Sequence, residues 1–126
     1  MLFRLNTILA GGLCLLSILT LSADSKAADN ATKRIVFIAG KPSHNYGAHE
    51  HFAGSRILAD VIQKTDSSAK CEVIRNGWPQ DDSFLDNADA IVIYSDGGGG
   101  HPALPHLEKL QKQMDRGAGF VCIHYA

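Results

Sequence analysis

The chain has 126 residues, enough for one domain, with 45% hydrophobic residues and a formal net charge of −1 at pH 7. Its 12 basic residues form no cluster, so the electrostatic pattern of a nucleic-acid-binding protein is missing and we expect no nucleic-acid partner.

Residues 1–27 have the pattern of a secretory signal peptide. Arg4 precedes an apolar run over residues 5–21, and a Ser-Lys-Ala triplet ending at Ala27 has small residues at the −3 and −1 positions of a cleavage site. The alternative is a membrane anchor, but the run is short for a span and is interrupted by polar and glycine residues. We therefore predict cleavage near Ala27, a periplasmic or secreted protein, and no stable membrane anchor after cleavage.

The first half of the remaining chain predicts strand, helix and edge strand. Residues 34–39 form a continuous apolar run, typical of a strand buried on both faces. After a loop over residues 41–50, apolar positions recur with helical spacing, and we expect this stripe to face a sheet: Gly54, Ile57, Leu58, Val61 and Ile62. Residues 71–75 alternate more between apolar and polar side chains, and this pattern predicts an edge strand.

The second half repeats the alternation of helix and strand. Residues 82–87 favour a short helix, and residues 90–94 predict a second doubly buried strand. A helix is predicted over residues 102–116, with one apolar face made of Ala103, Leu107, Leu110 and Met114. Residues 119–123 predict a third doubly buried strand.

Alternating strands and helices predict an α/β fold with a parallel, flavodoxin-like sheet in the order 2-1-3-4. This order places Cys71 and Cys122 on strands about 14 Å apart, so we expect both thiols to be free. Ligands of such sheets bind beyond the carboxyl ends of the strands, where the order reverses. The sequence stops at Ala126, directly after the fourth strand, which leads us to expect that it is the front portion of a longer protein.

Five of the six histidines fall on loops that leave the carboxyl ends of three strands, whereas His106 falls on the following helix. Histidine is the commonest metal ligand and titrates near neutral pH. The candidate metal set, for a divalent ion such as zinc, is His44, His49, His51, His101 and His124, with Glu50 or Asp96 as the carboxylate. Plain structural histidines in polar loops are the alternative. If a helix has already begun at His49, that residue and His51 point apart and cannot chelate together.

Four consecutive glycines, Gly97, Gly98, Gly99 and Gly100, follow the strand at residues 90–94. A dinucleotide fingerprint would need glycine where Pro102 stands, and no Lys-Ser/Thr pair follows to make a phosphate loop. A flexible turn is the alternative. We expect instead that bare backbone amides serve as donors to a substrate oxygen or a developing oxyanion.

Three segments in order, RIVFIAGKPSHNYGAHEHFAG, ADAIVIYSDGGGGHP and GAGFVCIHYA, resemble a ThuA-like (trehalose utilisation) domain, a branch of the class I glutamine amidotransferase-like fold. The resemblance covers residues 33–126 and implies that residues 28–126 are the N-terminal part of such a domain. It also implies carbohydrate metabolism, including the handling of 3-keto disaccharides. Where amidotransferases of this fold place a nucleophilic cysteine this chain has His124, while Cys122 lies inside the strand, so glutamine hydrolysis is not expected.

The functional expectation is an exported protein that acts on a small-molecule sugar or glycoside, as a hydrolase or lyase, by histidine acid/base or metal-assisted chemistry. His124 and His101 are the catalytic candidates, and the substrate-binding candidates are the four glycines together with Ser43, His44 and Tyr46. Two alternatives stay open: a carbohydrate-binding module without catalysis, and an amidotransferase-like domain with an unusual nucleophile. Trp78 could stack on a sugar ring, but packing is the expected role.

Overall fold

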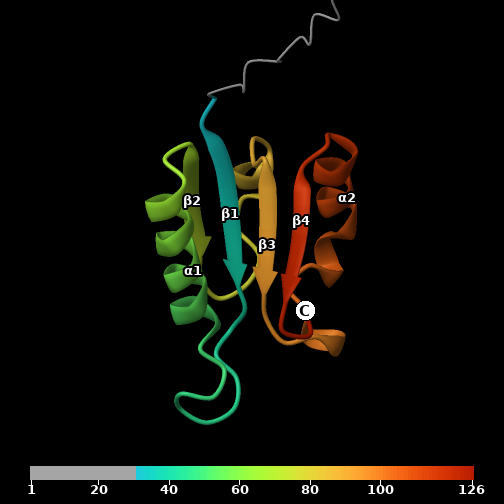
Figure 1. Ribbon diagram of the computed structural model, residues 1–126. Coiled ribbons are helices and arrows are strands. Elements are labelled where there is room, and N and C mark those ends of the chain that lie inside the picture. Colours follow the sequence, from blue (N-terminus) through green and yellow to red (C-terminus); the bar gives the residue numbers. More distant parts are fainter. Residues whose placement is uncertain (1–30) are drawn as a thin grey trace, which may run out of the picture.

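Four parallel strands form one sheet in the computed structural model, which describes residues 31–126. They are β1 (Lys33–Ala39), β2 (Ala69–Ile74), β3 (Ala90–Tyr94) and β4 (Gly119–Ile123), in the order β2-β1-β3-β4. Figure 1 shows all four arrows pointing the same way. The predicted flavodoxin-like α/β sheet with order 2-1-3-4 is confirmed, whereas the predicted signal peptide, residues 1–27, lies outside the described residues.

Two α-helices and three short 3-10 turns connect the strands. The helices are α1 (His51–Thr65) and α2 (Leu107–Asp115), and the turns are η1 (Asp82–Leu85), η2 (Gly98–Gly100) and η3 (Leu104–His106). Parallel neighbours need such crossovers because the chain must return to the starting end of the sheet. No helix within residues 31–126 is long and apolar enough to cross a membrane.

The core has two apolar layers, one on each face of the sheet, because successive strand side chains point to opposite faces. On one face, Val36 and Ile38 of β1 pack with η1 and with partly buried residues of α2. On the other face, Phe37 and Val92 pack against Ala59 of α1. The two helices therefore cover opposite faces of the sheet.

The predicted apolar stripe of α1 is wrong at three of its five positions. Its inward face consists of His51, Ser55 and Ala59, while three stripe residues point to solvent, with exposures of 64% for Ile57, 38% for Leu58 and 54% for Val61. The physical reason is close approach: small side chains bring the helix so near the sheet that a Cβ at Gly54 would crowd the ring of Tyr94. Of the apolar stripe, Ile62 joins the core.

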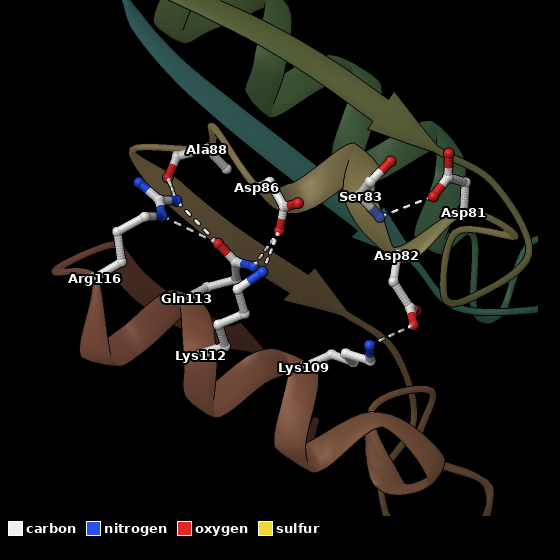
Figure 2. A network of polar contacts seen from close by, with 9 residues as sticks. All are labelled: Asp81, Asp82, Ser83, Asp86, Ala88, Lys109, Lys112, Gln113 and Arg116. Carbon is white, nitrogen blue, oxygen red and sulfur yellow. Dashed lines mark hydrogen bonds and ion pairs between the residues drawn. The ribbon is translucent and has the colours of Figure 1, made fainter.

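The segment predicted as one helix over residues 102–116 is interrupted at its start. It opens with η3 and continues as α2, and Leu107, predicted to be inside, is 56% exposed. Gln113 is buried instead, because its side-chain amide donates to Asp86 Oδ1 over 3.0 Å. Figure 2 shows this amide within a polar network that ties α2 to η1, including an ion pair between Lys109 and Asp82.

The last strand, β4, is an edge strand and is not doubly buried as predicted. Phe120 is 41% exposed and Val121 48% exposed, because β4 pairs with β3 on one side and, within the described residues, with no strand on the other. The edge position of β2, predicted from its alternation, is confirmed. So are the free thiols of Cys71 and Cys122.

Candidate functional site

The carboxyl ends of β1, β3 and β4 deliver their loops to one edge of the sheet, where the loop between β1 and α1 projects beyond the strands (Figure 1). In the strand register, Ala39 lies opposite Tyr94, and Tyr94 lies opposite Ile123. The residues that follow these three positions therefore leave the sheet side by side. Asp96 and His124 are among them.

Asp96 lies at the centre of a histidine cluster. Its Oδ1 atom is 2.9 Å from Nδ1 of His49, 3.6 Å from Nε2 of His51 and 3.8 Å from Nδ1 of His124. A hydrogen bond from Ser43, and then the three imidazoles when protonated, hold the pKa of the Asp96 carboxyl below its ordinary value. Asp96 is therefore an anion at neutral pH, with imidazoles on several sides.

His51, the first residue of α1, is the most buried member of the cluster, with 1% of its side chain exposed. Its Nδ1 lies 3.0 Å from the carbonyl oxygen of Lys41, which can only accept a hydrogen bond, so Nδ1 carries the proton. In the neutral ring, Nε2 then offers a lone pair, and among residues 31–126 neither it nor Asp96 Oδ1 has a hydrogen-bond partner. Two buried acceptors facing each other are costly unless His51 is protonated or a cation lies between them.

His124 is held in an unusual backbone conformation at the turn after β4. Its φ is 68°, in the left-handed region that residues other than glycine rarely adopt. Such strain is concentrated at functional sites, where surrounding contacts maintain it. His51, Asp96 and His124 each offer one ligand atom within 4.8 Å of the others, so this inner group could hold a metal ion.

A second, outer group with the same property consists of His44, His49 and Asp96. Ser43 pairs with His49 in an isolated antiparallel bridge that closes the loop, and His44, at φ 62°, places its ring 4.2 Å from that of His49. Ser43 Oγ lies 2.8 Å from Nδ1 of His49, the same nitrogen that meets Asp96. This is not a Ser-His-Asp triad, because a triad uses the two ring nitrogens for different partners.

Four of the five predicted metal ligands come together, and Asp96 supplies the carboxylate. His101 stays apart from both groups: its Nδ1 accepts a hydrogen bond from the backbone N–H of Ala103 at 3.2 Å. The helix begins at His51, yet the rings of His49 and His51 lie 5.6 Å apart and both reach Asp96. They do not diverge because His49 precedes the helix.

Two of the four consecutive glycines, Gly97 and Gly98, are required, each by a different constraint. A Cβ at Gly97 would fall inside contact distance of the carbonyl oxygen of Tyr125, so no side chain fits between β3 and the turn that carries His124. Gly98 has φ 67°, which favours glycine, and Cβ atoms at Gly98, Gly99 and Gly100 would point into open space. The role of these amides as donors to a substrate stays a prediction.

A cavity of about 490 Å³ adjoins Asp96, and His124 is not among the residues that line it. Its wall includes Ser43, Asp96 and His101, which the sequence singled out, Trp78, for which packing was the expected role, and three residues that the sequence did not single out: Asn76, Gly77 and Pro102. Asn76 and Gly77 follow β2, and the signal that could have found them is the strand order, since β2 lies beside β1. Tyr46 is fully exposed and does not line this cavity.

Trp78 is fixed on the wall of the cavity by two contacts. Its indole stacks on the ring of His106, with centroids 4.8 Å apart and planes 3° from parallel. Its Nε1 atom donates to Asp82 Oδ1 over 2.7 Å. Trp78 also packs against the core, so the expected packing role is confirmed while the cavity position adds a second one.

Comparisons of the chain with protein-family models, with curated proteins and with solved structures found no match. The coarse conclusion that the geometry supports is a group of histidines with one aspartate, at the carboxyl edge of a flavodoxin-like sheet, that could hold a metal ion.

Proposed function

We propose that this protein is an exported, ThuA-like, carbohydrate-active protein that binds a divalent cation such as zinc and uses it on a sugar or glycoside. One observation carries the proposal: the buried Nε2 of His51 faces the carboxylate of Asp96 at 3.6 Å without a hydrogen bond. A bound cation satisfies both groups at once, because each would donate a lone pair to it.

The spacing of the inner group suits a single ion. Zinc binds imidazole nitrogen and carboxylate oxygen at about 2.0–2.2 Å, so two ligands of one ion lie about 3–4 Å apart. Asp96 Oδ1 lies 3.6 Å from Nε2 of His51 and 3.8 Å from Nδ1 of His124, which is within this spacing. Metal-binding histidines typically donate their other ring N–H to a carbonyl or carboxylate oxygen, as Nδ1 of His51 does to the backbone carbonyl of Lys41.

Three protein ligands leave positions for water and substrate, which distinguishes catalytic from structural zinc sites. When bound, such an ion lowers the pKa of water and polarises carbonyl or hydroxyl oxygens. The chain itself would hold the ion through His51, Asp96 and His124.

The cavity beside Asp96 supports a carbohydrate as the substrate. It combines apolar surfaces, Trp78 and Pro102, with hydrogen-bonding groups on Ser43 and Asn76. Pockets of this size usually bind ligands through apolar walls and a few polar contacts. Lys41 and Asp96 contribute opposite charges, so a neutral polyol suits the wall better than an anion. The finer assignment to 3-keto disaccharides is supported by the sequence resemblance alone.

The competing function is a carbohydrate-binding module without catalysis. The cavity favours it because its wall by itself offers an aromatic side chain and polar groups to a sugar. The two functions differ in one respect: a module binds sugar equally well with and without the cation, whereas an enzyme of the proposed kind needs the cation for turnover.

The cation is tested by metal analysis of the protein, purified without an affinity histidine tag and dialysed against zinc. We expect bound zinc in the wild type and a large loss in His51→Gln and Asp96→Asn. His106→Gln is the matched control, because His106 lies outside both groups, and it should bind as the wild type does. A wild type without zinc, or equal zinc in all four proteins, contradicts the proposal.

The substrate is tested by tryptophan fluorescence, because Trp78 is the one tryptophan of the chain. Trehalose, maltose, glucose and glucose 6-phosphate are titrated with zinc and with a chelator. A change in Trp78 emission with a neutral sugar supports the carbohydrate assignment. A response to the phosphate alone, or to none of the four, contradicts it.

A further inference from the structure

The four imidazoles around Asp96 divide into two pairs. His51 and His124 form the inner pair, and His44 and His49 form the outer pair. The two groups share Asp96 and no other residue. Asp96 therefore stands between two sets of candidate ligands, and this division bears on how many ions the site takes.

One ion cannot use all four imidazoles. Ligands at about 2.1 Å from a zinc-sized ion lie at most about 4.2 Å from one another. Within the described chain, no group with ligand atoms inside 4.8 Å of one another combines His49 with His51 or with His124. A single ion that takes the inner pair leaves the outer pair unused.

We propose that the site is dinuclear: Asp96 bridges an inner divalent cation held by His51 and His124 and an outer one held by His44 and His49. A carboxylate has two oxygens with about four lone-pair positions, enough to serve two ions. Paired ions in hydrolytic centres lie about 3.5–4 Å apart and hold a water between them. This inference rests on the proposed cation site and goes beyond it in the number of ions.

The outer pair is built into a closed loop. The bridge between Ser43 and His49 joins the two ends of the loop, and the Glu50 carboxylate accepts a hydrogen bond from the backbone N–H of Gly47 at 3.1 Å. His44 is thereby held against His49, with the two rings nearly perpendicular at 72°. The two ligands are therefore side by side before an ion arrives.

The two positions differ in burial, so their affinities should differ. His51 is buried and its ring is oriented by Lys41, whereas His44 is exposed. Loss of an orienting contact of this kind typically lowers metal affinity 10- to 100-fold. Two divalent ions that share one carboxylate also repel each other. We therefore expect stepwise binding, with the outer ion at least about tenfold weaker than the inner one.

The test is a titration of the metal-free, untagged protein with Co²⁺, followed by visible absorption and electron paramagnetic resonance. We expect two Co²⁺ per chain in two steps. The resonance signal should rise in the first step and fall in the second, because a bridging carboxylate couples neighbouring spins. The wild type saturating at one Co²⁺ would overturn the dinuclear centre and leave the proposed cation function standing; no Co²⁺ at all would overturn both.

Variants assign the two positions. His44→Ala, at an exposed loop residue, should remove the second step and keep the first, and His51→Gln should weaken the first. The control His106→Gln should keep both steps. Circular dichroism checks the fold of each variant, and His49→Gln repeats the outer test if His44→Ala is misfolded. Two Co²⁺ still bound in both outer variants would overturn the assignment.

Discussion

The Nδ1 atom of His51 donates to the carbonyl oxygen of Lys41 over 3.0 Å, and this contact decides which ring nitrogen faces Asp96. Because the carbonyl only accepts, the proton stays on Nδ1 and the neutral ring turns a lone pair toward the carboxylate. The backbone just after β1 thus sets the tautomer of a residue at the start of α1. The proposed cation site depends on this tautomer, because it leaves the lone pair of Nε2 free to bind an ion.

His51→Leu should separate stability from metal binding. The change removes the unpartnered buried Nε2 but also the hydrogen bond to Lys41, so in a chelator the free energy of unfolding should stay close to wild type. With zinc at 100 times its dissociation constant, the wild type should gain about 2.7 kcal/mol and the variant much less. Urea unfolding in both conditions measures this. An equal gain from zinc in the two proteins would contradict the ligand role of His51.

Gly97→Ala should destabilise the protein, because its methyl group would collide with the carbonyl oxygen of Tyr125. Overpacking of this kind typically costs about 1–3 kcal/mol. Gly99→Ala is the matched control, since a Cβ there meets open space, and it should cost much less. The free energies of unfolding from urea titrations decide between them. Equal values for the two variants would show that the turn after β4 moves freely aside.

Stability should fall in acid partly through Asp86. Hydrogen bonds from Gln113 and then Lys112 lower the pKa of its carboxyl in the folded protein. A lowered folded pKa means that this contribution is complete above the unfolded value of about 3.9 and is lost as the pH falls below it. Asp86→Asn should therefore show a shallower loss of stability between pH 5 and roughly pH 2. Urea midpoints across this range test it, with exposed Asp60→Asn as the control.

The two thiols of the described chain should react at different rates. Burial raises the pKa of the Cys71 thiol, while Cys122 is exposed on the edge strand β4. Because the thiolate is the reactive form, a disulfide reagent should modify Cys122 first. The measurement uses Cys14→Ser to remove the third cysteine, and adding Cys122→Ser should leave only the slow phase. A fast phase that persists without Cys122 would contradict the placement of β4.

The outer face of α1 should tolerate charge. Val61 is 54% exposed although its position matches the apolar pattern, so Val61→Lys should change the free energy of unfolding by less than about 0.5 kcal/mol. Ala59→Leu, on the inward face, should cost about 1–3 kcal/mol by overpacking against Phe37 and Val92. The reverse order in thermal or urea unfolding would mean that the helix is rotated from the position seen here.

The strands of this fold were predictable because each is a short apolar run bounded by polar or glycine residues. Residues 90–94 and 119–123 match β3 and β4 residue for residue. The strand order could also be predicted from the sequence. Crossovers between parallel strands are right-handed, and once one strand is placed at the edge only a few topologies remain. The exposure of β4 could not be predicted from the sequence, because an apolar run has the same residue pattern whether or not a neighbouring strand covers it.

The candidate site was predictable in part for the same reason. Parallel strands deliver the residues after their carboxyl ends to one edge, so His44, His49, His51 and His124 could be grouped from chain order alone. His101 was grouped with them and does not belong, because the short turn of glycines sends its ring toward the backbone of Ala103 instead. The direction in which the chain leaves a glycine turn depends on backbone dihedral angles, and glycine allows many values of these angles.

The sequence by itself determined the sheet, its order and the edge at which chemistry gathers, because these follow from hydrophobic pattern and chain direction. Only the tertiary structure decided the contacts that give the site its properties. Asp96, one of two candidate carboxylates, lies among three imidazoles, and Nε2 of His51 is buried with its lone pair toward it. Trp78 reaches a cavity wall from the loop after β2. Such contacts join residues distant in sequence, and they depend on helix rotation, loop closure and ring orientation, which no local pattern encodes.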